Sequence, residues 1–322
     1  MDYAIIGAGM AGLACADALK AAGHSVALFD KGRAPGGRVS TRRLETPLGE
    51  VSFDHGAQYL TARDPGFRQL VGTWSGLGLV APWPTAGADA WVGVPGMNAI
   101  IRRMASAHTV AWSHLVKGIV RTDGKWWLLG EAGKTGTYDA VILAIPAEQA
   151  AAILSLHDFN MARIALMVRS QPCWTSMLVF DQPLGGLPLV IRNSGAIGWA
   201  ARNSAKPGRS GPEAWVVQAS GSWSLEHLEE SQEHVSAQLF AALSNVSVCS
   251  IPEPTTMVSH RWRYALSAGT GDGALWNPRI GLGVCGDWLL GPRVECAWQS
   301  GRMLAKHCRE TAQIAAEAAY DV

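Results

Sequence analysis

Residues 3–30 read YAIIGAGMAGLACADALKAAGHSVALFD, and this stretch decides the fold. It opens with an apolar run, Tyr3 to Ile6, which leads directly into a glycine-rich turn. An alanine- and leucine-rich segment, Met10 to Ala22, then predicts a helix that ends at Gly23. The apolar run Ser25 to Phe29 predicts a second strand, which Asp30 follows. Strand, glycine turn, helix, strand and acid within about thirty residues predict a βαβ unit that binds a dinucleotide.

Each glycine of this turn has a separate physical task. Gly7 permits the tight turn, and Gly9 lets backbone N–H groups approach a pyrophosphate without an intervening Cβ. Gly12 lets the helix pack close to the strand, and the helix N-terminus offers N–H donors and a positive dipole end to the phosphates. Asp30 is expected to accept both hydroxyls of an adenosine ribose and to repel a 2′-phosphate, which disfavours NADP at this site.

A second G-x-G-x-x-G match occurs at Gly281 to Gly286. It lies inside an apolar run with no second βαβ unit behind it, so residues 280–285 are predicted to be a strand. The chain is therefore expected to contain one dinucleotide fold and no separate NAD(P)H domain. Gly36-Gly37-Arg38, soon after Asp30, predicts a loop that approaches the same pyrophosphate with a guanidinium group.

Composition excludes several classes of function. The 322 residues are 48% hydrophobic and 16% charged, which is typical of a globular protein. The formal net charge of +1 gives no long-range attraction to nucleic acid or an anionic membrane, and no run approaches the roughly 20 apolar residues of a membrane span. The six cysteines and nine histidines lack metal-binding spacing, so no metal is expected. Reduced thiols and the absence of a signal peptide predict a cytoplasmic protein.

Several blocks, in order along nearly the whole chain, resemble the flavin-containing amine oxidase superfamily and, within it, the bacterial renalases. The more specific blocks are the Gly-Ala-Gln-Tyr-x-Thr-Ala-Arg-Asp run at 56–64 and the Gly-Asp-Trp to Arg-Val-Glu run at 286–295. The resemblance implies an α/β fold with a Rossmann-type domain for non-covalent FAD and an interleaved, sheet-rich α+β substrate domain. The FAD domain is expected at 1–80, 97–150 and 275–322, and the substrate domain at 81–96 and 151–274. A long amphipathic helix is predicted from Trp223 to Ser244.

The resemblance also implies where the ligands bind. Met10 and the glycines would hold the pyrophosphate, Asp30 and Lys31 the ribose, and Val116, on a strand, the adenine by its backbone. The full set of implied FAD contacts is Gly7, Gly9, Met10, Ala11, Gly12, Asp30, Lys31, Arg38, Ala57, Gln58, Val116, Asp287 and Val294. The implied substrate contacts are Tyr59, Leu60, Thr61, Ala62, Arg63, Cys173 and Trp288. The superfamily more often has Thr at the position of Cys173, which weakens the case for a hydroxyl contact there.

The activity that the resemblance implies is oxidation of dihydropyridine nucleotides, the 2- and 6-dihydro isomers of NAD(P), with dioxygen as acceptor and hydrogen peroxide as product. The chemistry is carried by the flavin, so no side chain is expected to be catalytic. Arg63, Arg202 and Lys206 are candidates for a substrate pyrophosphate, although a lone arginine is more often a surface ion-pair partner. Two alternatives remain: an amine oxidase or desaturase on the same scaffold, and a non-catalytic flavin- or nucleotide-binding protein.

Overall fold

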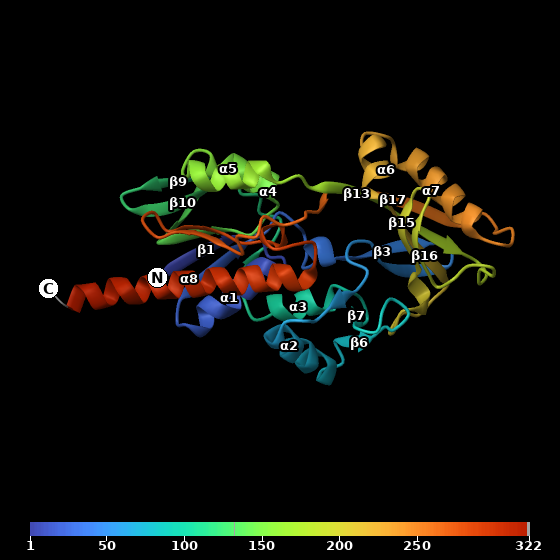
Figure 1. The fold of residues 1–322 in the computed structure, drawn as a ribbon, viewed down its shortest axis with the longest axis horizontal. Helices are drawn as coiled ribbons and strands as arrows, with labels where there is room; N and C mark the ends of the chain where they lie inside the picture. Colours follow the sequence, from blue (N-terminus) through green and yellow to red (C-terminus); the bar gives the residue numbers. More distant parts are fainter. Residues whose placement is uncertain (132, 321–322) are drawn as a thin grey trace. The chain divides into compact units, whose positions relative to one another are not determined.

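The computed structural model describes residues 1–131 and 133–320, which form two compact units (Figure 1). Unit 1 consists of Met1–Gly37, Ile101–Arg169 and Ser267–Val322, and unit 2 of Arg38–Ile100 and Ser170–Leu266. Each unit is therefore assembled from segments that are distant in the sequence.

Unit 1 is an α/β unit around a largely parallel sheet. Its elements are β1 (Asp2–Ile6), α1 (Met10–Ala21), β2 (Ser25–Phe29), β8 (Val110–Ala111), β9 (Gly118–Thr122), β10 (Lys125–Gly130), β11 (Gly133–Tyr138), β12 (Ala140–Leu143), α4 (Ala147–Leu154), α5 (Phe159–Met167), β18 (Leu275–Asn277), β19 (Leu282–Val284) and α8 (Val294–Tyr320). The central sheet has the order β18-β19-β12-β1-β2-β8, and only the β18–β19 pair is antiparallel. Its middle strand β1 is buried from Tyr3 to Ile6, as both faces of a parallel sheet usually are.

Helix α8 runs beside α1 in unit 1 (Figure 1). A Cβ on Gly301 of α8 would lie only 2.2 Å from the carbonyl oxygen of Ala11, so the two helices pack at a distance that a side chain there would prevent. The predicted strand, turn, helix and strand at the N-terminus are confirmed within a residue. The rejection of the second glycine motif is also confirmed, because Leu282–Val284 form strand β19 and a 3-10 turn follows at Asp287–Leu289.

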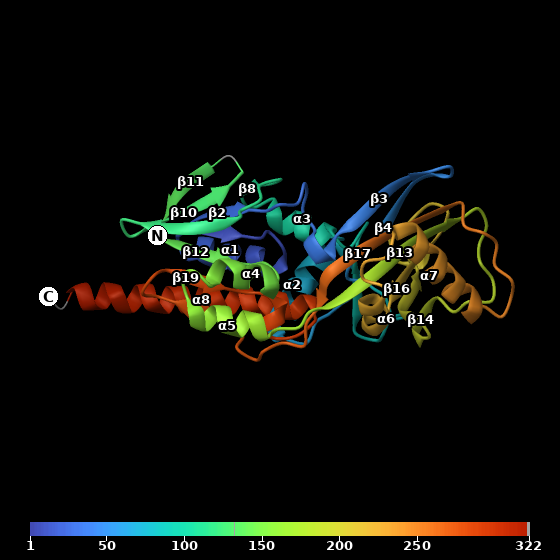
Figure 2. The same ribbon diagram turned by 90° about the horizontal axis from the view of Figure 1, so that it is seen from above.

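Unit 2 contains a five-stranded antiparallel sheet of order β14-β15-β16-β13-β17. Figure 2 shows helix α7 on one face of this sheet and the β3–β4 hairpin on the other. The elements of unit 2 are β3 (Thr41–Thr46), β4 (Gly49–Asp54), β5 (Leu60–Thr61), α2 (Pro65–Gly76), β6 (Val80–Pro82), β7 (Ala90–Gly93), β13 (Gln171–Phe180), β14 (Val190–Ser194), β15 (Ile197–Arg202), β16 (Glu213–Ala219), α6 (Gly221–Glu226), α7 (Gln232–Val246) and β17 (Thr256–Leu266). Helix α3 (Ala99–Ala105) starts at the boundary of the units.

The single helix predicted from Trp223 to Ser244 is wrong, because the segment forms two helices. Helix α6 ends at Glu226, and α7 begins only at Gln232. The hydroxyl of Ser231 accepts a hydrogen bond from the backbone N–H of His234 at 3.2 Å, which is an N-cap that starts a new helix. Hydrophobic periodicity continues across such a break, so periodicity alone did not reveal it.

The division into units differs from the predicted domain boundaries. Residues 38–80 and 97–100 group with unit 2, and residues 151–169 and 267–274 group with unit 1. The reason for the first difference is packing: Val51 and Phe53 of β4 belong to a core cluster with Met177 and Val179 of the five-stranded sheet. Within the described chain, no helix is both long enough and apolar enough to cross a lipid bilayer.

Candidate functional site

The turn between β1 and α1 has the geometry of a phosphate-binding turn. Gly7 has φ +105°, and a Cβ there would lie 2.3 Å from the carbonyl oxygen of Ala144. A Cβ on Gly12 would lie 1.9 Å from the carbonyl oxygen of Gly7, so helix and strand approach too closely for any larger residue. The predicted steric roles of these two glycines are confirmed.

Gly9 differs, because among the described residues, its two chain neighbours aside, no atom lies within 4 Å of the position that its Cβ would take. It has an ordinary φ of −82° and serves as the N-cap of α1 without a side-chain cap. The backbone N–H groups of Met10, Ala11 and Gly12 lie in the first helical turn, where an α-helix provides no carbonyl partners. Gly37, in the predicted pyrophosphate loop, lies next to this space, with its Cβ position 3.9 Å from the Cα of Gly9. Unfilled space beside free amides fits a phosphate group.

Asp30 is held by the backbone on both of its carboxylate oxygens. Oδ2 accepts the N–H of Ala8 at 2.7 Å, and Oδ1 accepts the N–H of Gly32 at 2.7 Å. A carboxylate oxygen has two lone pairs, so each still has one for a ribose hydroxyl. The backbone contacts fix the carboxylate next to the glycine turn, while Lys31 is exposed. The predicted ribose contacts of both residues stay predictions.

Four more predicted ligand-binding residues belong to unit 1. Val116 precedes β9 rather than lying on a strand, and its side chain is buried in the core, so a contact would come from its main chain. Val294 is the first residue of α8, where the backbone N–H has no helical partner. Asp287 is buried at the start of a 3-10 turn. Trp288 is 1% exposed and donates its indole N–H to the carbonyl oxygen of Ile145 at 3.1 Å, so it packs in the core of unit 1.

In unit 2, the register of the five-stranded sheet places one row of side chains on the face opposite α7, which we call the hairpin-side face. The row runs across the sheet through Arg192, Trp199, Gln218, Thr175 and His260, which are directly paired neighbours. Paired residues of adjacent strands point to the same face. This row is therefore a continuous polar and aromatic strip on a sheet whose opposite face is apolar.

The predicted substrate segment runs over this strip. The ring of Tyr59 lies 5.3 Å from the ring of Trp199 at an interplanar angle of 36°. Gln218 donates from its side chain to the carbonyl oxygen of Gly56 at 2.8 Å, which ties the segment to the sheet. Leu60 and Thr61 form β5, Ala62 is half-buried, and Arg63 is exposed with Nε 3.8 Å from Oδ2 of Asp89.

Cys173 lies on the same face, two residues from Thr175, with its Sγ 3.8 Å from the Thr175 hydroxyl. Burial raises the pKa of the Cys173 thiol to about 11, and the thiol is therefore a neutral group at physiological pH. The structure thus brings two predicted substrate contacts, Tyr59 and Cys173, onto one face of one sheet.

His55 starts the segment that crosses the strip. Its ring lies 5.0 Å from that of His260 and 5.1 Å from that of Trp262, whose indole N–H donates to the His55 carbonyl at 2.8 Å. Burial lowers the pKa of His55 to about 3, helped by His260 and by the positive charge of Arg42. Burial also lowers the pKa of His260. Both rings are neutral near pH 7, which agrees with a packing role rather than that of a base.

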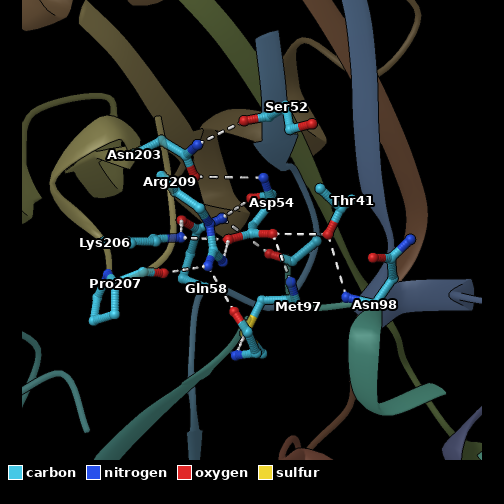
Figure 3. Close-up of polar contacts among 12 residues, drawn as sticks. Thr41, Ser52, Asp54, Gln58, Met97, Asn98, Asn203, Lys206, Pro207 and Arg209 are labelled. Atoms are coloured by element: carbon cyan, nitrogen blue, oxygen red, sulfur yellow. Dashed lines mark hydrogen bonds and ion pairs between the residues drawn. The ribbon is translucent and has the colours of Figure 1, made fainter. Parts of the chain in front are cut away.

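A buried ionic cluster around Asp54 organises the loops of unit 2 (Figure 3). Asp54 is fully buried, with Oδ2 3.2 Å from Nζ of Lys206 and in contact with Nη2 of Arg209. Its Oδ1 accepts the backbone N–H of Met97 at 2.8 Å and the Thr41 hydroxyl at 2.8 Å. The cluster therefore joins the end of β4 to the loops near residues 97 and 206.

Lys206 is the one lysine in the sequence of unit 2, and its side chain is fully buried. Its ammonium donates to Asp54 and to Oε1 of Gln58 at 3.0 Å, and it lies 5.3 Å from the ring of Trp83. Burial lowers the pKa of Lys206 to about 8, although the charge of Asp54 opposes this change. The ammonium thus has two hydrogen-bond acceptors and an aromatic ring as partners inside the protein, and Lys206 does not present a free charge to a substrate pyrophosphate.

The remaining predicted contacts are also occupied within unit 2. Gln58 is 5% exposed and directs its amide into the Asp54 cluster, so only its backbone is available to a cofactor. The N–H of Ala57 donates to the carbonyl of Arg38 at 2.8 Å, and Nη1 of Arg38 donates to the carbonyl of Ala265 at 3.2 Å. Arg202 is paired with the buried carboxylate of Glu213 at 2.5 Å.

Sequence reasoning missed the residues that build these two arrangements. No role was predicted for Asp54, Thr41 and Arg209 of the ionic cluster, or for Arg192 of the strip. Arg192 and Trp199 are seven residues apart and become neighbours only through the register of β14 and β15. The one available signal was an arginine directly after the apolar run Leu189 to Ile191.

Comparison with known proteins agrees with this fold. The profile of a family described as flavin-containing amine oxidoreductase matches residues 84–307, and that of an NAD(P)-binding Rossmann-like domain matches residues 5–74. Mouse renalase is 25% identical in an alignment 295 residues long, which covers 81% of this chain and 84% of renalase.

Two solved structures share the fold at low identity. Cyclohexylamine oxidase from Brevibacterium oxydans superposes with a TM-score of 0.76 at 14% identity, covering 97% of this chain and 99% of that one. Putrescine oxidase bound to putrescine superposes with a TM-score of 0.68 at 15% identity, covering 98% and 99%.

The chain belongs to the flavin-containing amine oxidoreductase family. It is a flavin-dependent oxidoreductase with a Rossmann-type unit, and the predicted resemblance to renalase is confirmed. The cofactor is FAD, and the residues present fit it: the space at Gly9, the free amides of the α1 N-terminus and the fixed Asp30 carboxylate suit a pyrophosphate followed by a ribose.

Proposed function

We propose that this protein oxidises dihydropyridine nucleotides, the 2- and 6-dihydro isomers of NAD(P), and passes the electrons to dioxygen. When bound, FAD supplies a hydride acceptor at N5 and a reduced form that dioxygen reoxidises to give hydrogen peroxide. The substrate gives up one hydride and becomes an aromatic pyridinium, and the peroxide takes its second proton from solvent. The likeness to renalase over 81% of the chain supports this choice of substrate.

The observation that carries the proposal is the aromatic strip of unit 2. Tyr59 packs on Trp199, and the guanidinium carbon of Arg192 lies 4.5 Å from the centre of the Trp199 ring. Flat side chains that are held by one another present rigid surfaces, which suit a flat dihydropyridine ring and its planar product. Such surfaces orient the ring, and orientation is the main contribution that a protein makes to a hydride transfer.

Oxidation of a dihydropyridine requires no general base, and this also favours a dihydropyridine as the substrate. A dihydropyridine needs to lose only a hydride, whereas a protonated amine must first lose a proton. Amine oxidases of this superfamily commonly place a lysine near the flavin, but Lys206, the one lysine of unit 2, is enclosed by Asp54, Gln58 and Trp83. His55 and His260, which lie together at the β17 end of the strip, have lowered pKa values. Both rings are therefore neutral near pH 7.

We further propose a cytoplasmic location and a small-molecule substrate, without a nucleic acid or membrane partner. The free cysteines support a reducing compartment: all six lack disulfides, although Cys249 is exposed on the surface of its unit. The predicted domain roles follow from the same reasoning, with unit 1 for FAD and unit 2 for the substrate.

Anaerobic flavin reduction tests the proposal. Borohydride-treated NAD, which contains the 2- and 6-dihydro isomers, should bleach the flavin absorbance quickly. Ordinary 4-dihydro NADH should do so slowly, because its hydride leaves from another ring carbon. Rapid bleaching by putrescine or cyclohexylamine, with no response to the isomers, would favour the amine oxidase alternative. No bleaching by either class would favour a non-catalytic flavin protein.

A further inference from the structure

Arg192 is a fixed positive charge on the edge strand of the five-stranded sheet. Its guanidinium lies over the ring of Trp199 at 4.5 Å, and its Nη2 donates to the carbonyl oxygen of Ala86. Among the residues that the structure describes, no carboxylate lies within 4.0 Å of it, and the residue is exposed. Stacking and one hydrogen bond from Nη2 therefore orient this exposed guanidinium, which carries five N–H donors in all.

The position of Arg192 connects it to the substrate segment. The ring of Trp199 contacts both the guanidinium of Arg192 and the ring of Tyr59. Arg192 and Tyr59 are therefore linked through a single aromatic side chain. The segment 84–89 also joins the two regions, since Ala86 receives the Arg192 hydrogen bond and Asp89 lies 3.8 Å from Nε of Arg63. Two arginines thus flank one short segment beside the aromatic strip.

Two other basic residues of unit 2 that were candidates for a substrate pyrophosphate are already neutralised. Arg202 is paired with Glu213, and Lys206 with Asp54. Arg63 is exposed, and its Nε lies 3.8 Å from Oδ2 of Asp89. Arg192, which has no carboxylate within 4.0 Å among the described residues, is therefore able to meet an anionic group that enters beside Tyr59.

We propose that Arg192 binds the diphosphate of the dinucleotide substrate; this inference rests on the proposed function. A guanidinium fork matches two phosphate oxygens, and prior stacking on Trp199 reduces the entropy lost on binding. In a dinucleotide, one ribose separates the dihydropyridine ring from the diphosphate. In unit 2, one aromatic side chain, Trp199, separates Tyr59 from Arg192, so a ring beside Tyr59 would direct the diphosphate toward Arg192. Arg192 would then select dinucleotides over nucleosides without taking part in hydride transfer.

The test compares substrates that differ in phosphate content. Anaerobic stopped-flow reduction of the flavin would be measured with the 2- or 6-dihydro isomers of nicotinamide riboside, NAD and NADP. In Arg192→Gln, the apparent Kd for the NAD isomer should rise about 10- to 100-fold, as expected for loss of a charge-assisted contact. The Kd for the riboside and the limiting rate of reduction should stay unchanged. Arg192→Lys, which keeps the charge but not the fork, should give an intermediate Kd.

Arg43→Gln is the matched control, because Arg43 is an exposed arginine of unit 2 on the β3–β4 hairpin, where it faces Glu50 at 3.9 Å. This variant should bind all three substrates like the wild type. An equal loss for the riboside and the NAD isomer in Arg192→Gln would show that Arg192 only supports the aromatic stack, and the proposal would fail. A loss confined to the NADP isomer would assign Arg192 to the 2′-phosphate and would likewise overturn it.

The proposed function fails in a different way. If none of the three dihydropyridines reduces the wild-type flavin, both proposals fall together. If all three reduce it and Arg192→Gln leaves every Kd unchanged, only the assignment of Arg192 is lost.

Discussion

The substitution Asp54→Asn removes the only negative charge from the buried cluster of unit 2 while keeping the shape of the side chain. In the wild type, the carboxylate faces both Lys206 and Arg209, whose side chains are 0% and 4% exposed. The amide of an asparagine would turn N–H donors or a neutral oxygen toward these two cations. Both cations would then remain buried without a counter-charge.

The expected cost is large. Removing one partner of a buried ion pair typically destabilises a protein by ~3–5 kcal/mol, because a charge is left uncompensated. Burial raises the pKa of Asp54, but Lys206, Arg209 and the N–H of Met97 outweigh burial and hold the pKa at about 2. A carboxylate with a lowered pKa in the folded state stabilises the protein above its ordinary pKa near 4, and this contribution, ~2 kcal/mol, is lost as the pH falls toward 2.

Urea unfolding of the FAD-saturated protein, followed by tryptophan fluorescence and far-UV circular dichroism, measures the effect. Asp54→Asn should lose at least ~3 kcal/mol at pH 7, and its deficit should shrink between pH 4 and pH 3. The exposed Asp181→Asn should stay within ~0.5 kcal/mol of the wild type.

A second variant keeps the test decisive if Asp54→Asn fails to fold. Lys206→Met removes one buried cation and leaves Asp54 paired with Arg209, so it should cost only ~1–2 kcal/mol. The double variant should be more stable than the sum of the single changes implies, by ~1 kcal/mol or more. A deficit below ~1 kcal/mol for Asp54→Asn, with additive behaviour in the double variant, would refute the reasoning.

Three further predictions concern the cofactor and the reaction. Gly9→Val should purify with little flavin, because its side chain would fill the space beside the α1 amides, and Asp30→Ala should weaken FAD binding by roughly 1.5–3 kcal/mol. Full flavin occupancy in both variants, measured by absorbance, would exclude this site. Trichloroacetic acid should release all FAD into the supernatant, since the cofactor is expected to be non-covalent; yellow precipitate would contradict this. Flavin reduction by the dihydro isomers should vary little between pH 5 and pH 7, because His55 titrates at about 3 and Cys173 at about 11, and a steep one-proton dependence that disappears in His55→Ala would reveal a base.

The dinucleotide unit could be predicted from the sequence because its chemistry is local. Gly7, Gly12 and Asp30 stand at fixed distances along the chain, and the turn that they form is built by that same stretch. A contact between close neighbours depends on backbone sterics and helix geometry, which a sequence reports directly. The second glycine motif at 281–286 could be rejected for the same reason, since its local context lacked the βαβ pattern.

The division of the chain into two units could not be predicted from local sequence patterns. The hairpin that contains Val51 and Phe53 follows the dinucleotide unit in the sequence, yet its apolar side chains complete the core of the five-stranded sheet. Apolar patterning shows that a strand has a buried face but does not say which distant surface covers it.

The sequence by itself determined the family, the FAD-binding turn and the segment Tyr59 to Arg63 as a candidate substrate contact. The enclosure of Lys206 by Asp54 and Gln58 depends on the tertiary structure, and so does the absence of a carboxylate partner for Arg192 among the residues that the structure describes. Asp54 and Lys206 are 152 residues apart, and both charges look equally available in the sequence. Whether a charge is free for a ligand depends on its desolvation and on its partners in space, and strand register and loop packing set both.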